Sequence, residues 1–102
     1  MKSITAEQLK RRLDNRTAPF MLDVRAPEEM ADGVIPGSVN IPMEEVERRL
    51  RELPIEGEIV VICHMGMRSM YVAKRLKALG YDEVANLKGG VDAWLRLSEP
   101  LK

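Results

Sequence analysis

Apolar positions along the chain follow two kinds of spacing. Short, nearly continuous apolar runs predict strands, and the four β-branched residues Ile59 to Ile62 favour a strand buried on both faces. The predicted strands span 19–25, 38–42, 58–63 and 83–87. Apolar residues three and four positions apart, with charges between them, predict helices. The predicted helices span 4–15, 26–33, 43–53, 69–80 and 89–97.

Local signals support these limits. Thr5 with Gln8 forms a capping-box pattern, Pro27 suits a first helical turn, and Gly33 and Gly80 suit helix ends. The last helix is expected to pack Val91, Trp94 and Leu95 inward. Strands that alternate with helices indicate an α/β fold with a mostly parallel sheet. Ligands of such sheets bind outside the carboxyl ends of the strands, and Cys63 falls at one of these ends.

The composition excludes several classes of protein. The 102 residues predict a single domain over 1–102, and 16 basic residues balance 16 acidic ones, so no nucleic-acid or membrane surface is expected. The charged start predicts no secretory signal, and no apolar run reaches membrane-spanning length. One cysteine excludes an intramolecular disulfide and a Cys-x-x-Cys pair. These features favour a soluble, reduced, cytoplasmic protein.

The segment from Cys63 to Ser69 joins the central strand to a helix. Backbone N–H groups in such a turn, together with the helix dipole, favour an anion and ease the ionisation of a thiol. Gly66 permits the turn, Arg68 suits an anionic substrate, and Ser69 suits an N-cap that also donates into the loop. A lone cysteine after a strand is often a core residue. The Gly-x-Arg-Ser that follows favours a functional thiol instead.

Four motifs in this order resemble the single-domain members of the rhodanese, or thiosulfate sulfurtransferase, family. They are DVRAPEEM at 23–30, GVIPGSVNIP at 33–42, CHMGMRS at 63–69 and LKGGVDAW at 87–94. The resemblance implies a rhodanese-like three-layer fold, with about five mostly parallel strands and helices on both faces. It also implies a sulfur relay without a cofactor or a metal, in which Cys63 forms a persulfide and passes sulfur on by ping-pong kinetics.

The resemblance assigns roles within this relay. Cys63 is the nucleophile, and Asp23 and Arg25 support the loop, although an ordinary surface ion pair is the alternative for these two. The substrate-binding residues are expected to be His64, Met65, Gly66, Met67, Arg68 and Ser69. Expected partners are a small-molecule sulfur donor and an acceptor such as cyanide, a small thiol or a protein thiol. The chain is expected to act as a monomer or a weak homodimer.

Several alternatives stay open. His64 either assists the thiolate or is merely exposed, and Met65 and Met67 either fill space at the rim or shift donor choice away from thiosulfate. Related phosphatases use a loop one residue longer than the Cys63–Arg68 loop, which argues against phosphate chemistry. A persulfide carrier for a partner protein, or a non-catalytic interaction module, are the alternative functions. The presence of both Cys63 and Arg68 favours catalysis.

Overall fold

The computed structural model describes residues 1–97 and is built around one parallel sheet. Its five strands lie in the order β1-β5-β4-β2-β3, and every neighbouring pair is parallel. The strands are β1 (Ser3–Ile4), β2 (Phe20–Asp23), β3 (Val39–Asn40), β4 (Ile59–Ile62) and β5 (Val84–Leu87). Because β4 is the middle strand, the residue that follows it, Cys63, lies at the centre of the carboxyl edge of the sheet.

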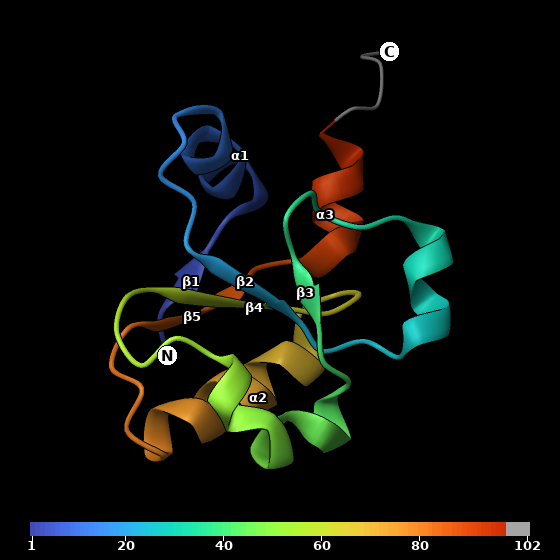
Figure 1. The fold of residues 1–102 in the computed structure, drawn as a ribbon. Helices are drawn as coiled ribbons and strands as arrows, with labels where there is room; N and C mark the ends of the chain where they lie inside the picture. The colour runs from blue at the N-terminus through green and yellow to red at the C-terminus, as the bar shows by residue number, and fades with distance from the viewer. Residues whose placement is uncertain (98–102) are drawn as a thin grey trace.

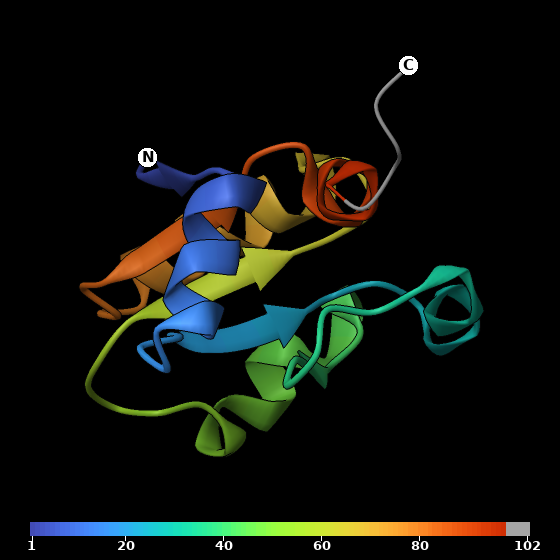
Figure 2. The same cartoon turned by 90° about the horizontal axis from the view of Figure 1, so that it is seen from above.

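Helices cover both faces of the sheet. They are α1 (Ala6–Asp14), α2 (Met67–Ala78) and α3 (Gly90–Arg96), with two 3-10 helices, η1 (Pro27–Asp32) and η2 (Met43–Glu52). In Figure 1, α1 and α3 lie on one face of the sheet, and α2 lies with the green η2 on the other. Figure 2 shows the cyan η1 beyond the arrowheads of the strands. The predicted three-layer α/β fold with a parallel sheet is therefore confirmed.

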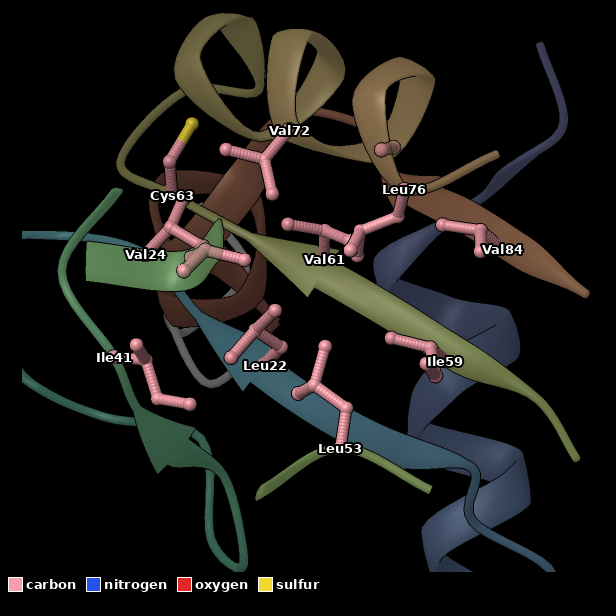
Figure 3. Close-up of a cluster of buried hydrophobic side chains, with 12 residues drawn as sticks. Leu22, Val24, Ile41, Leu53, Ile59, Val61, Cys63, Val72, Leu76 and Val84 are labelled. Carbon is pink, nitrogen blue, oxygen red and sulfur yellow. The ribbon is translucent and has the colours of Figure 1, made fainter. Parts of the chain in front are cut away.

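The sheet separates two apolar cores. One lies toward α2 and η2 and is shown in Figure 3; it includes Leu22, Val61, Val72 and Leu76, with Cys63 at its margin. The other lies toward α1 and α3 and contains Leu9, Met21, Ile35, Val60, Ile62, Ala85, Leu87 and Val91. Since successive side chains of a strand point to opposite faces, Ile59 to Ile62 supply both cores in turn. Burial on both faces, predicted from the unbroken β-branched run, is confirmed.

Three predicted helix ends are confirmed. Gln8 N donates to Thr5 Oγ1 at 3.1 Å and Thr5 N donates to Gln8 Oε1 at 2.9 Å, which completes the capping box at the start of α1. Pro27 occupies the first position of η1, and Gly33 follows its last turn. The segments 27–32 and 43–52 wind as 3-10 helices, and Arg49 interrupts the second one.

Two details of the fold differ from the sequence predictions. β1 was not predicted, because two residues, Ser3 and Ile4, are too short to show a period; they pair with Asn86 and Leu87 of β5. The prediction that Leu95 packs inward is wrong, since this residue is 41% exposed. It lies over Gly33 rather than the core, where a Cβ on Gly33 would come within 3.1 Å of Leu95 Cδ2. Val91 is buried and Trp94 packs against the core, as predicted.

Candidate active site

Cys63 begins the loop that links the central strand β4 to helix α2. The turn is made at Gly66, whose φ of 102° is left-handed and accessible to glycine at low cost. The amino end of α3 is hydrogen-bonded to the loop: Val91 N donates to Cys63 O at 2.9 Å, and Asp92 N donates to His64 O at 3.0 Å. Three elements therefore fix the position of the cysteine backbone. Figure 3 shows its sulfur directed toward the first turns of α2.

Hydrogen-bond donors surround the sulfur. Gly66 N donates to Cys63 Sγ at 3.0 Å, and Ser69 Oγ lies 3.2 Å from the same atom. Burial raises the pKa of the Cys63 thiol, because the residue is only 1% exposed. Hydrogen bonds from the Ser69 hydroxyl and from the backbone N–H groups of Ser69, Gly66 and Met65 outweigh burial, so the net pKa lies below the ordinary value. The loop thus favours the nucleophilic thiolate.

Ser69 is buried within the first turn of α2 and does not cap the helix. The predicted N-cap role is wrong, because Gly66 occupies that position and α2 starts at Met67. The left-handed turn at Gly66 brings the chain into the helix earlier than the sequence suggested. The Ser69 hydroxyl is thereby free to contact Cys63 Sγ on one side, and it donates to Asn86 Oδ1 on the other. Its predicted donation into the loop stays a prediction, because either Cys63 Sγ or Ser69 Oγ can be the donor between them.

Asn86 is a residue of the site that the sequence prediction missed. It lies in β5, is 4% exposed, and its Nδ2 donates to Gly66 O at 3.2 Å. Its two amide atoms therefore hold both Ser69 and the turn of the cysteine loop. A polar residue in the otherwise apolar strand 84–87 was the signal that could have revealed it.

Arg68 is held by a carboxylate on η1. Its NH1 and NH2 groups each donate to Glu29 at 2.8 Å, which forms a bidentate ion pair. The bond to Arg68 is the main reason why the pKa of Glu29 falls to about 2, and a hydrogen bond from Ala26 N adds to it. A guanidinium has five N–H donors, so this pair leaves three for another anion. Glu29 lies in the first turn of η1, and its contact with Arg68 was not predicted from the sequence.

Asp23 and Arg25 form a buried ion pair at the carboxyl end of β2. They are 0% and 1% exposed, and Arg25 NH2 donates to Asp23 Oδ2 at 2.8 Å. Arg25 also donates to the carbonyl oxygens of Glu29 at 3.1 Å and Gly33 at 2.8 Å. The alternative of a surface ion pair is therefore wrong. This pair ties η1, which carries Glu29, to the sheet.

The remaining loop residues form an exposed rim. His64 is exposed, and Met65 and Met67 are 60% and 83% exposed. Their place beside the buried cysteine fits contact with a substrate, but their side chains make no hydrogen bond to the sulfur. Within residues 1–97, no three side chains of His, Cys, Asp or Glu gather as a metal site would require. In the same range, no helix is long and apolar enough to span a membrane.

Comparisons with known proteins agree with this geometry. The rhodanese-like domain family matches residues 5–97. A sulfurtransferase of Allochromatium vinosum is 35% identical over 101 residues, which cover 99% of this chain and 94% of that protein. The human thiosulfate:glutathione sulfurtransferase is 35% identical over 89 residues, 74% of this chain and 77% of that protein.

A solved structure shows the same fold. The rhodanese-related protein from Thermoplasma volcanium superposes with a TM-score of 0.87 at 32% identity, covering 98% of this chain and 96% of that one. The resemblance read from the four sequence motifs is thus confirmed. The chain, with its parallel sheet and its cysteine loop between β4 and α2, belongs to the family of rhodanese-like domains.

Proposed function

We propose that this protein is a sulfurtransferase that moves a sulfane sulfur from thiosulfate or another persulfide donor to a thiophilic acceptor. The observation that carries the proposal is the donor-lined position of Cys63 Sγ, with Gly66 N at 3.0 Å and Ser69 Oγ at 3.2 Å. Such a loop stabilises negative charge on sulfur. The names of the relatives support sulfur transfer as the chemistry.

In the first step, the Cys63 thiolate attacks the outer sulfur of the donor. With thiosulfate, a new sulfur–sulfur bond forms to Cys63, the bond to the sulfonate sulfur breaks, and its electron pair leaves with sulfite. The enzyme then holds one additional sulfur, as a persulfide anion. The N–H groups of Met65, Gly66 and Ser69, which lower the pKa of Cys63, are suited to stabilise that charge.

In the second step, cyanide or a thiolate attacks the outer sulfur of the persulfide. The sulfur–sulfur bond to Cys63 breaks, its electron pair returns to Cys63 as a thiolate, and the acceptor leaves with the sulfur. The two steps share one covalent intermediate, so the kinetics should be ping-pong. Neither step requires a cofactor or an external reductant beyond the acceptor itself. Because the cycle requires a reduced cysteine, we expect it to operate in the cytoplasm.

Arg68 is the residue best placed to orient an anionic donor. It lies in the first turn of α2 beside the cysteine loop, and three of its N–H groups remain after the pair with Glu29. Thiosulfate is named as a substrate of the human relative, which favours it as a donor here. The exposed Met65 and Met67 also suit a bulkier organic persulfide.

The test is the intact mass of the protein after incubation with thiosulfate. We expect a gain of one sulfur atom, which cyanide then removes as thiocyanate. Cys63→Ser, which removes the chain's one thiol, is the matched control and should show no gain. A folded wild-type protein that gains no sulfur from thiosulfate or from an organic persulfide would refute the proposal.

A persulfide carrier is the second candidate. The exposed methionines at 65 and 67 favour it, because flexible apolar side chains beside a reactive group suit contact with a protein. A carrier would gain sulfur as readily as an enzyme but pass it slowly to cyanide or small thiols. Turnover of several equivalents of thiosulfate per Cys63 would support the enzyme, and a single rapid loading without turnover would support the carrier.

A further inference from the structure

Four residues close a ring of hydrogen bonds around the cysteine. We call Cys63, Gly66, Ser69 and Asn86 the cysteine ring. Gly66 N donates to Cys63 Sγ, Cys63 Sγ contacts Ser69 Oγ, Ser69 Oγ donates to Asn86 Oδ1, and Asn86 Nδ2 donates to Gly66 O. Cys63, Ser69 and Asn86 are at most 4% exposed, so burial keeps water from forming hydrogen bonds with their side chains. The protons of the ring must therefore be shared within it.

The Ser69 hydroxyl has one proton and two neighbours that need it. When Cys63 is a thiol, its S–H can donate to Ser69 Oγ while the Ser69 proton goes to Asn86 Oδ1, and every group is satisfied. When the thiol proton leaves for solvent, the sulfur can only accept. The Ser69 proton can then serve the thiolate or Asn86 Oδ1 but not both, so the two acceptors compete for it.

Rotation of the amide does not resolve this conflict. If the Asn86 amide turned over, its Nδ2 would serve Ser69 Oγ, but Oδ1 would then face Gly66 O, another acceptor. A buried acceptor without a donor is energetically unfavourable, because its lost contact with water is not replaced. That cost falls on the thiolate and not on the thiol.

We propose that Asn86 is a positioning residue that competes with Cys63 for the Ser69 proton and so restrains ionisation of the sulfur. This inference adds to the proposed function, because it concerns how the attacking thiolate is controlled. A persulfide carries its charge on the outer sulfur, which leaves Ser69 able to donate to Asn86 again. Asn86 therefore favours the sulfur-loaded state over the free thiolate.

Other charges around the ring are already paired or lie at the surface. Arg68 is paired with Glu29, Arg25 with Asp23, and Asp92 with Arg96, while His64 and Tyr71 are exposed. The elements that meet at Cys63 contribute these ionisable groups: Asp23, Arg25, Glu29, His64, Arg68, Tyr71 and Asp92. None of them belongs to the ring. Substitutions at Ser69 and Asn86 therefore change which group receives the Ser69 proton, and they leave every charged residue in place.

The test is a double-mutant cycle on the ionisation of Cys63. The pH dependence of iodoacetamide alkylation reports the thiol directly, because the chain has one cysteine. It requires no sulfurtransferase activity, so its outcome is independent of whether the proposed function holds. The variants are Asn86→Ala, Ser69→Ala and the double variant. Val84→Ala, a buried residue of β5 outside the ring, is the matched control for strand packing.

The expected signs differ between the two single variants. Ser69→Ala removes a donor from the thiolate and should raise the pKa of Cys63. Asn86→Ala releases the Ser69 proton to the thiolate and should lower the pKa, by about one unit, a tenfold rise in the thiolate-to-thiol ratio. In the Ser69→Ala background, Asn86→Ala should have no effect. A higher pKa in Asn86→Ala, or an equal shift in both backgrounds, would overturn the proposal.

A measurement on the wild-type protein covers the case in which a variant does not fold. The ¹³Cγ resonance of the Asn86 side chain should move with the same midpoint as the Cys63 ionisation, because Oδ1 loses its donor there. Asn40 is the control amide, since its Nδ2 donates to Asp23 O and Arg25 O outside the ring. An Asn86 resonance that stays constant through that midpoint would refute the competition for the proton.

Discussion

At the scale of single residues, several groups of the site also bind a second residue of the protein. Arg68 was predicted to bind an anionic donor, and that role stays a prediction; the structure adds that Glu29 occupies two of its N–H groups. The two residues are 39 positions apart, so no local pattern could have paired them. By contrast, Cys63, Gly66 and Ser69 lie within one short motif. Their proximity was predictable from the sequence, whereas the partner Asn86 comes from another strand.

Glu29 should limit the use of anionic donors. Glu29→Gln leaves the hydrogen bond from Ala26 N possible but removes the charge that neutralises Arg68. We expect the KM for thiosulfate to fall about fivefold with kcat unchanged, because one added positive charge at a partly exposed site attracts the dianion by about 1 kcal/mol. Steady-state kinetics with thiosulfate and cyanide measure this.

The control for Glu29 is the partner residue itself. Arg68→Ala should raise the KM for thiosulfate about tenfold, and a neutral organic persulfide should be affected far less by either variant. A rise in KM for Glu29→Gln would mean that the carboxylate orients Arg68 for the donor and does not compete with it.

At the scale of elements, sequence patterns predicted the strands better than the helix ends. The apolar run 59–62 predicted a buried strand, and the same argument from short apolar runs predicted β2 and β5. The start of α2 depended on the left-handed turn that places Gly66 at its N-cap position. The exposed position of Leu95 depended on where α3 meets Gly33, a tertiary contact.

The join between the cysteine loop and α3 should tolerate no side chain. Gly90 has a φ of 60°, and a Cβ there would lie 2.4 Å from both Cys63 O and His64 O. We expect Gly90→Ala to lower the free energy of unfolding by at least about 2 kcal/mol, since backbone must move. Urea unfolding followed by circular dichroism measures it.

Gly57→Ala is the matched control for that substitution. Gly57 also has a positive φ, 97°, but no atom lies within 4 Å of a Cβ built there. Gly57→Ala should lower the free energy of unfolding by about 1 kcal/mol, because only the unfavourable positive φ contributes. Equal losses in the two variants would show that the close contact at Gly90 is unimportant.

The buried ion pair of β2 should support η1. Arg25→Ala leaves Asp23 buried without a partner and removes the bonds to Glu29 O and Gly33 O. We expect a loss of about 3–5 kcal/mol in the free energy of unfolding. Arg48→Ala, which breaks an exposed pair with Glu45, should cost less than about 1 kcal/mol and serves as the control. A small loss for Arg25→Ala would contradict a supporting role.

At the scale of the whole molecule, three layers bring the partners of one thiol together. β4 delivers Cys63 to the centre of the sheet's carboxyl edge, α2 brings Ser69, β5 brings Asn86, and α3 holds the loop backbone. The apolar pattern of the chain predicted this architecture. The hydrogen bonds between distant elements could not be predicted, because they depend on register and on side-chain direction.

The Glu29–Arg68 pair should make the free energy of unfolding depend on pH in the acidic range. The pKa of Glu29 is about 2 in the folded protein and 4.5 as the ordinary value, so its contribution is complete above about pH 4.5 and is lost as the pH falls toward 2. Because the pair is partly exposed, the contribution is below about 1 kcal/mol. Urea unfolding between pH 2 and 6 should show a smaller loss in Glu29→Gln than in the wild type. Parallel curves for the two proteins would contradict this.

The most direct test of the account is the ionisation of Cys63 in the folded and the unfolded protein. The ultraviolet absorbance of the thiolate can be followed against pH in buffer and in concentrated urea, with Cys63→Ser as the blank. We expect a lower midpoint in the folded protein, because hydrogen bonds from the loop outweigh burial. A folded midpoint equal to or above the unfolded one would contradict it.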